Sequence, residues 1–307
     1  MEEKSFSTKP TITEDKIPII VIVGPTASGK TGLSIKLAKK LDGEIVSADS
    51  RQIYRGLDLG TGKVTKKEIS GIKHHLLNVA DPKKKFFVTD FVKLADKSIA
   101  EIHSRGKTPI VVGGTGFYIQ ALVDGLILPE VPPNLELRKK LAKKSALELQ
   151  KILEKLDKKR YSTIDKNNSH RLIRAIEIAT ALGEVPALQT NPKYDPTFIG
   201  ISIPIDELRV KIHTRLLSRI KAGMIDEVRN LHKNGLSWKR MEDLGLEYRY
   251  VARFLQDKIT KEEMLIQLET AICQYAKRQM TWFKRDKRIK WLNAEISQRS
   301  QRCDICS

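Results

Sequence analysis

An unbroken apolar segment that runs straight into a glycine-rich turn constrains this chain more than any other feature. Residues 17–23 read I-P-I-I-V-I-V, and a helical pattern begins directly after the turn. A short, mainly β-branched apolar run is typical of a strand buried on both faces of a parallel sheet. The turn fits the pattern G-x-x-x-x-G-K-[ST], which joins such a strand to a helix in phosphate-binding loops. It consists of Gly24, Pro25, Thr26, Ala27, Ser28, Gly29, Lys30 and Thr31.

The residue types of this turn suit a bound phosphate group. Its glycines let backbone amides close around phosphate oxygens, and the start of the following helix adds a favourable dipole. Lys30 supplies a cation, and the hydroxyl of Thr31 suits a magnesium ion. The loop does not reveal whether a nucleotide is cleaved.

The rest of the chain alternates expected strands with helical patterns, such as the one at 87–104. This alternation predicts an α/β fold, with a P-loop NTPase-like parallel sheet flanked by helices. The expected strands are 17–23, 44–48, 74–79, 108–112, 198–203 and 289–292.

The residue pattern of the sequence changes near residue 128. The segment L-P-E-V-P-P at 128–133 breaks regular structure, and 134–182 then reads as successive charged amphipathic helices. We therefore expect a helical insertion domain within the α/β core. The expected divisions are the first part of the P-loop core at 17–128, the insertion at 129–196, the remaining core with basic C-terminal helices at 197–297, and tails at 1–16 and 298–307.

The charge of the chain favours a polyanionic partner such as nucleic acid. Lysine and arginine total 56 against 37 for aspartate and glutamate, which gives a net charge of +19. An ordinary basic enzyme is consistent with the same charge. No apolar run approaches the length of a membrane span, and residues 1–16 lack the apolar centre of a signal peptide, so we expect a cytoplasmic protein without membrane contact.

The three cysteines do not indicate a zinc site. Cys303 and Cys306 form a single C-x-x-C, whereas a zinc ion needs about four ligands and the sequence holds no second pair. Together with Cys273, we interpret them as free thiols.

Two further segments follow expected strands and should reach the same edge of the sheet as the glycine-rich turn. In the first, Asp49 could accept a proton or hold a metal through water, or Asp49 or Ser50 could merely cap a helix. In the second, V-G-G-T-G at 112–116, Thr115 could donate to a phosphate, or the glycines could serve a tight connection from strand to helix. The residues leave both interpretations open.

Taken together, these segments resemble the tRNA dimethylallyltransferase family, also called tRNA isopentenyltransferases. The segment M-E-D-L-G-L-E-Y at 241–248 replaces the family's more usual I-G-Y, a departure that bears on tRNA contacts and not on the chemistry. The matches run in family order over nearly the whole chain. They are G-P-T-A-S-G-K-T at 24–31, S-A-D-S-R-Q-I-Y-R-G-L-D-L-G-T-G-K at 47–63, H-H-L-L at 74–77 with Asp81-Pro82, V-G-G-T-G-F-Y-I at 112–119, H-R-L-I-R-A-I-E at 170–177 and A-K-R-Q-M-T-W-F at 276–283.

The resemblance implies transfer of a dimethylallyl group from dimethylallyl diphosphate to N6 of the adenosine immediately 3′ of the anticodon in tRNA, with release of diphosphate. The loop at 24–31, Arg215, and magnesium at Thr31 would offset the charge that builds on the diphosphate. Asp49 would take the N6 proton, and Thr115 would help to position the reacting groups. An anticodon loop makes extrusion of the target base less costly than a duplex would.

A basic segment near the C-terminus suits the RNA substrate. Residues 273–292 interleave cations with aromatic side chains, which fits phosphate contact and base stacking, although an amphipathic helix with a solvated basic face has the same pattern. This segment and the resemblance together place the expected tRNA contacts. They are Asp49, Ser50, Arg51, Gln52, Arg138, His170, Arg171, Arg174, Lys277 and Arg278.

Three alternative functions share parts of the pattern. A small-molecule P-loop kinase would need a lid of catalytic arginines and has no reason for a basic helical tail. An AMP-directed isopentenyltransferase would keep the prenyl chemistry, but a free nucleotide needs little surface, so the insertion and the charge argue against it. A non-enzymatic RNA-binding module would have no use for Lys30, Thr31 and Asp49 gathered at one crevice.

Overall fold

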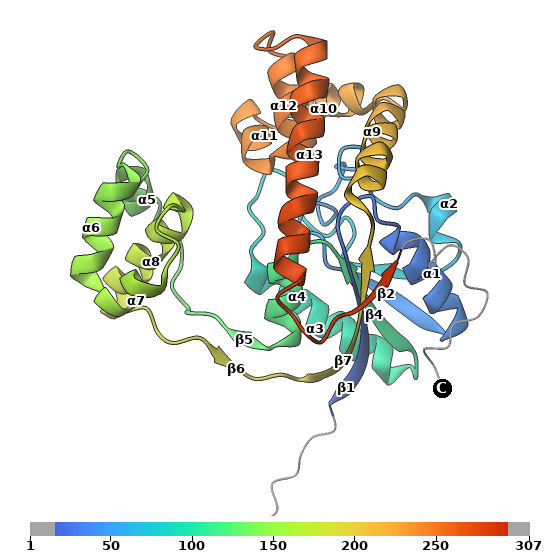
Figure 1. Ribbon diagram of the computed structural model, residues 1–307, viewed down its shortest axis with the longest axis horizontal. Coiled ribbons are helices and arrows are strands. Elements are labelled where there is room, and N and C mark those ends of the chain that lie inside the picture. The colour runs from blue at the N-terminus through green and yellow to red at the C-terminus, as the bar shows by residue number, and fades with distance from the viewer. Residues whose placement is uncertain (1–15, 294–307) are drawn as a thin grey trace, which may run out of the picture. The chain divides into compact units, whose positions relative to one another are not determined.

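A six-stranded sheet forms the centre of the computed structural model, which describes residues 16–293. Its strand order is β3-β2-β4-β1-β7-β8, and every neighbouring pair is parallel (Figure 1). Residues 1–15, Cys303, Cys306 and the expected C-terminal tail lie outside the described residues. The strands are β1 (Ile17–Val23), β2 (Gly43–Ser47), β3 (His74–His75), β4 (Thr108–Gly113), β7 (Tyr194–Ser202) and β8 (Lys290–Asn293).

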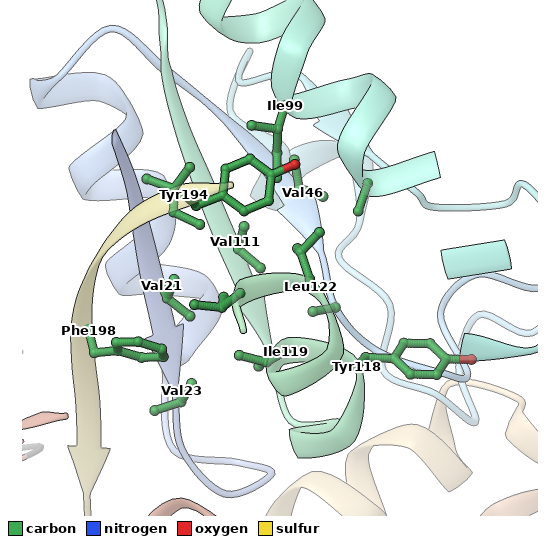
Figure 2. Packing of buried hydrophobic residues seen from close by; sticks show 14 of the residues in the cluster. Val21, Val23, Val46, Ile99, Val111, Tyr118, Ile119, Leu122, Tyr194 and Phe198 are labelled. Carbon is green, nitrogen blue, oxygen red and sulfur yellow. The ribbon is translucent and has the colours of Figure 1, made fainter. Parts of the chain in front are cut away.

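Strand β1 lies between β4 and β7, and its side chains enter apolar cores on both faces of the sheet. Because successive side chains of a strand point to opposite faces, Val21 and Val23 join one core while Ile22 joins the other. On the first face they pack with residues of α3 (Val88–Ser104) and α4 (Gly116–Val123), as Figure 2 shows. The expected P-loop NTPase-like parallel sheet is confirmed.

The edge strand β3 is shorter than the predicted segment at 74–79. Only His74 and His75 pair with β2, because Leu76 and Asn78 adopt positive φ angles of 63° and 58°. Residues with such angles leave the extended conformation, so the pairing stops. The prediction of a strand there was right in place and wrong in length.

The helices after β7 form a separate apolar core with the loop that follows β2. Ile53 and Leu57 of that loop pack among residues of these helices, including Tyr248 and Leu268. The helices of the core besides α3 and α4 are α1 (Lys30–Lys40), α2 (Lys66–Ile69), α9 (Ile205–Lys221), α10 (Met224–Lys233), α11 (Trp238–Leu244), α12 (Leu246–Phe254) and α13 (Lys261–Phe283). Figure 1 shows α10 to α13 grouped together.

Residues 125–191 form a second compact unit, close to the helical insertion we expected at 129–196. Its helices pack on a small core of its own that includes Leu149, Leu153 and Leu172. The unit starts before the proline-rich segment because Leu126 and Ile127 pair with residues 189 and 190 as a two-stranded antiparallel ribbon. Its elements are β5 (Leu126–Ile127), α5 (Leu135–Leu141), α6 (Ala146–Leu156), α7 (Lys158–Thr163), α8 (Ser169–Leu182) and β6 (Gln189–Thr190).

None of the helices within residues 16–293 combines the length and the apolar character needed to cross a membrane.

Candidate active site

The glycine-rich turn after β1 adopts a conformation that requires glycine at two positions. Gly24 has a φ of 150°, and Gly29, which caps α1, has a φ of 91°. Nothing lies within 4 Å of the position that a Cβ on Gly29 would take. The turn therefore leaves open space beside Gly29 at the start of α1, and the start of a helix favours an anion.

Lys30 and Ser28 supply the turn with polar groups that the protein itself does not fully use. The Nζ atom of Lys30 donates to the carbonyl oxygen of Pro25 at 2.6 Å. Burial and the nearby Arg215 lower the pKa of Lys30 to about 7, while Asp49 opposes the shift. The hydroxyl of Ser28 is buried and has no hydrogen-bond partner among the described residues. An anion in the turn would satisfy both groups.

Thr31 begins the exposed side of α1, directly beside this open space. Its hydroxyl oxygen belongs to the class of hard ligand that magnesium prefers, and phosphate oxygens complete such sites. The open turn, the unpaired hydroxyl of Ser28 and the accessible Thr31 fit a diphosphate with its magnesium ion.

Asp49 lies just after β2 and uses one carboxylate oxygen for its own turn. Oδ1 accepts hydrogen bonds from the amides of Arg51 at 2.8 Å and Gln52 at 3.3 Å. No hydrogen bond to a described residue uses Oδ2. No helix begins here, so Asp49 does not cap a helix as one sequence interpretation expected: one oxygen holds a turn, and the other remains available for chemistry.

The V-G-G-T-G turn after β4 is built by close packing. A Cβ atom on Gly113 would overlap the backbone of Ala48, and a Cβ on Gly116 would overlap the Trp282 ring. The hydroxyl of Thr115 accepts from the amide of Ser50 at 3.0 Å, which ties this turn to the segment after β2. The glycines thus serve the tight connection, and Thr115 faces Ser50.

Gln279 of α13 joins the two glycine-rich turns. Its Oε1 accepts from the amide of Thr26 at 2.8 Å, and its Nε2 donates to the carbonyl of Gly114 at 2.9 Å. We did not single out Gln279 from the sequence, although it belongs to the A-K-R-Q-M-T-W-F segment. Its buried side chain fixes the spacing between the turns.

Arg215 of α9 lies beside the loop at 57–63 and close to the P-loop lysine. Its Nη2 donates to the carbonyl of Gly62 at 3.1 Å, and its charge acts on Lys30. Burial and the neighbouring Arg219 lower the pKa of Arg215 to about 10, while Glu247 and Asp49 oppose the shift. Lys30, Arg215 and Asp49 therefore share one site, although three separate segments supply them.

The carboxylate of Glu227 holds the loop at 57–63, which accepts hydrogen bonds from Arg215 and Arg219. Glu227 of α10 accepts from the amides of Asp58 at 3.1 Å, Leu59 at 2.6 Å and Gly60 at 3.0 Å, and from the hydroxyl of Tyr248 at 2.9 Å. A half-buried carboxylate that accepts several hydrogen bonds holds a loop in one conformation.

Tyr275 of α13 is one of the aromatic side chains of the basic segment at 273–292 that the sequence suggests for base stacking. Burial, and to a smaller extent the charge of Asp49, raise its pKa to about 12. An aromatic ring with a polar end suits contact with a base or an allylic group.

The expected tRNA contacts in this unit fall into two groups. Arg51 and Gln52 are half-buried and lie with Asp49 and Ser50 at the site, whereas Lys277 and Arg278 are exposed on α13. On α13 the side chain of Gln279 faces the turns and the two cations face solvent. This helix therefore fits both sequence interpretations, an amphipathic packing element and a basic surface.

The expected contacts in the second unit include two arginines that a buried carboxylate holds. Arg138 and Arg174 both pair with Glu177, and their side chains are 31% and 35% exposed. Burial works against ionisation, but hydrogen bonds from Arg138 and Arg174 hold the pKa of Glu177 below its ordinary value. His170 and Arg171, at the start of α8, are exposed.

The histidines after β2 have structural roles. His75 bonds through Nε2 to Glu44 at 2.7 Å, and Nδ1 of His74 lies 2.9 Å from the carbonyl of Ile72. Residues 16–293 contain no group of three or more histidine, cysteine, aspartate or glutamate side chains placed to hold a metal ion.

Comparisons with known proteins place the chain beside a defined group of enzymes. A family model described as IPP transferase matches residues 52–286. A protein of Treponema denticola named tRNA dimethylallyltransferase 2 is 47% identical over 277 residues, which cover 88% of this chain and 93% of that protein. A protein of Syntrophus aciditrophicus named tRNA dimethylallyltransferase 1 is 43% identical over 90% of this chain and 94% of its own length.

Solved structures agree with these sequence relatives. The full-length tRNA isopentenylpyrophosphate transferase of Bacillus halodurans superposes with a TM-score of 0.70 at 36% identity, covering 91% of this chain and 90% of that one. A eukaryotic dimethylallyltransferase studied while acting on tRNA gives a TM-score of 0.77 at 27% identity, covering 91% of this chain and 74% of that one.

Proposed function

The chain belongs to the IPP transferase family, and from that membership we propose that it transfers a dimethylallyl group from dimethylallyl diphosphate to tRNA. The acceptor is N6 of the adenosine immediately 3′ of the anticodon. The reaction breaks the bond between the allylic carbon and the diphosphate oxygen, forms a bond from that carbon to N6, and releases diphosphate and a proton.

The observation that carries this proposal is the meeting of Lys30, Arg215 and Asp49 at the carboxyl edge of the sheet. As the allylic carbon leaves, negative charge builds on the diphosphate. Lys30, Arg215 and the amides of the turn at 24–31 would stabilise that charge, as fixed donors do at other developing anions. A kinase site would share the lysine and could also use a carboxylate, so membership of the family decides between the two interpretations.

Asp49 is the group we propose to take the proton from N6. Its Oδ1 is fixed by two backbone amides, so the carboxylate is already oriented before substrate binds. Thr115, bonded to Ser50, would position the segment that carries Asp49. An adenine amine is a weak nucleophile, so this orientation should contribute more than the basicity of the carboxylate alone.

We also propose which residues of the protein contact the tRNA. The exposed Lys277 and Arg278, with Ser50, Arg51 and Gln52 at the site, would meet the anticodon loop. His170, Arg171, Arg138 and Arg174 would add contacts from the second unit, the last two through the guanidinium edges that Glu177 leaves exposed.

Magnesium is the cofactor we propose, held by Thr31 together with the diphosphate. When bound, it would neutralise part of the charge of the leaving group. We also propose that the protein acts in the cytoplasm, as expected from the sequence.

A transfer assay tests the proposed function. The full-length protein is incubated with magnesium and labelled dimethylallyl diphosphate, with either an anticodon stem-loop or AMP as acceptor. We expect label in the stem-loop only. Label in AMP would instead support an AMP-directed enzyme, and phosphate transfer from ATP to a small acceptor would support a kinase.

Two matched variants test the role of Asp49 in this assay. Asp49→Asn keeps an acceptor for the two backbone amides but removes the base, so we expect a loss of at least about 100-fold in kcat without a lower melting temperature. Asp81→Asn is the control, because Oδ1 of Asp81 accepts from the amide of Lys83 at 2.9 Å in a similar turn. Equal activities of the two variants would contradict a role for Asp49 as base.

A further inference from the structure

Glu247 is a buried carboxylate in the segment at 241–248 that departs from the family pattern. It is the second residue of α12, and its side chain is 11% exposed. A carboxylate at such a position destabilises the fold unless a partner offsets the loss of hydration. The group that pairs with Glu247 therefore indicates the role of this residue.

The partner of Glu247 is Arg219, one turn along α9 from Arg215. Arg219 Nη1 lies 3.2 Å from Glu247 Oε1. Gly62 has no side chain, and both arginines pack directly against the position that its Cβ would take. Glu247, Arg219 and Arg215 thus form a continuous row that ends beside Lys30.

The charges of this row explain why a carboxylate is present. Lys30, Arg215 and Arg219 are three cations in one buried region, and the charge of Arg219 already disfavours that of Arg215. Asp49 and Glu68 are further carboxylates that act on Arg215, and the proposed reaction needs Asp49 for a proton. Burial raises the pKa of Glu247, and the charges of Arg219 and Arg215 oppose that shift, so the ionised carboxylate depends on these arginines and in turn offsets the charge of Arg219.

The backbone next to Glu247 is also unusual. Gly245 has a φ of 74°, and Leu246, directly before Glu247, has a φ of 40°. A residue with a side chain in this region costs of order 1–3 kcal/mol, and such residues persist where the surrounding structure requires them. The strained entry into α12 places the carboxylate at Arg219.

We propose that Glu247 is a positioning residue of the diphosphate site: it holds Arg219, and through Arg219 it keeps Arg215 directed at the leaving diphosphate. The inference deepens the proposed function and rests on it. The sequence led us to expect that the unusual segment affects tRNA contacts, whereas this inference assigns it to the prenyl donor.

Kinetics and diphosphate binding by the Glu247→Gln variant test the inference. We expect kcat for transfer to the stem-loop to fall about tenfold, because Arg215 is no longer held in place. The affinity for inorganic pyrophosphate with magnesium, measured by calorimetry, should stay within about threefold or increase, because the site becomes more positive. A structural role alone would not separate these two quantities.

Glu242→Gln is the matched control. Glu242 pairs with Arg253 at 2.7 Å between α11 and α12, so the variant also removes a carboxylate–arginine pair that holds α12. We expect it to leave both kcat and pyrophosphate affinity unchanged. Equal kcat values for the two variants would overturn the inference.

The double variant Arg219→Gln with Glu247→Gln covers the case in which Glu247→Gln unfolds. It removes both charges together, so no unpaired ion stays buried, and we expect a melting temperature near that of the wild type with kcat still low. Recovery of kcat along with stability would show that the pair only stabilises the fold. If the wild type transfers no label at all, the proposed function itself fails, whereas transfer by the wild type with equal kcat in Glu247→Gln and Glu242→Gln overturns this inference alone.

Discussion

Two glycine-rich turns lead from neighbouring parallel strands into helices, yet their glycines have opposite physical reasons. In the turn after β1, Gly29 has a φ of 91° and open space where a side chain would lie. In the turn after β4, Gly113 and Gly116 have ordinary φ angles, but added side chains would overlap Ala48 and Trp282. Gly29 is needed for its backbone conformation alone and Gly113 and Gly116 for close packing alone, whereas Gly24 of the first turn has both a positive φ and a close neighbour in the backbone of Ile201.

This difference separates ligand binding from architecture. A turn with open space and unsatisfied polar groups, such as the Ser28 hydroxyl, is prepared for an anion. The second turn is packed against other parts of the protein, and Gln279 bonds to its Gly114. This turn therefore holds the first turn in place. Substitutions in the two turns should therefore affect different measurements.

The largest expected effect is on catalysis, in the first turn. Lys30→Met removes the cation from the proposed leaving group and should lower kcat about 100- to 1,000-fold. The melting temperature at pH 7 should not fall, because burial and Arg215 already disfavour the charged lysine. Transfer kinetics and thermal unfolding measure both. Lys36→Met, at an exposed position of α1, is the control, and an equal kcat in the two variants would contradict the role of Lys30.

The next effect is on stability, in the second turn. Gly113→Ala forces a Cβ against the backbone of Ala48, which cannot move aside as a flexible side chain could. We expect the free energy of unfolding to fall by about 3 kcal/mol, the upper range of overpacking. Denaturant titration measures it. A loss below about 0.5 kcal/mol would mean that the two turns do not differ as described.

A smaller effect concerns pH and again belongs to the first turn. With a pKa of about 7, Lys30 loses its proton as the pH rises above 7 in the free protein, whereas bound diphosphate favours the charged form. Pyrophosphate affinity should therefore weaken about tenfold from pH 6 to pH 8 through this group. Calorimetry on Lys30→Arg, which stays charged, separates this change from the titration of pyrophosphate itself. Identical pH profiles of the two proteins would contradict the assignment.

The smallest effect compares two glycines at the start of α1. Gly29→Ala places a side chain in the left-handed region and should cost about 1–2 kcal/mol of stability. Gly32→Ala, which also has open space but lies within the helix, should add about 0.5–1 kcal/mol. Denaturant titration of both variants gives the comparison. Equal changes would show that conformation does not require glycine at position 29.

Local patterns made several features predictable. The apolar run at 17–23 is a strand in the structure with those same bounds, and the loop that follows it was evident from its own residues. Asp49 could be placed at the same edge of the sheet because parallel strands share their carboxyl edge. Arg215, by contrast, came from the family resemblance and not from any local signal.

The missed residues act through partners that are distant in the chain. Gln279 lies 253 residues from Thr26 and 165 from Gly114, and Glu247 meets Arg219 across a change of helix. Arg138 was expected to contact tRNA, and its pairing with Glu177, 39 residues away, had no signal in the sequence, unlike the i,i+3 pair of Arg174 with Glu177. In the sequence, a polar residue of an amphipathic helix looks the same whether its side chain is buried against a partner or exposed to solvent.

The sequence by itself determined the phosphate-binding turn and the parallel sheet around it, because these depend on short-range backbone preferences and apolar periodicity, and its motifs determined the family by resemblance. Only the tertiary structure decided why Gly113 and Gly116 are glycines, which carboxylate faces Arg219 and how Gln279 joins the turns. Those features are contacts between side chains and backbone that only folding brings together, and their energies depend on burial, which no local pattern specifies.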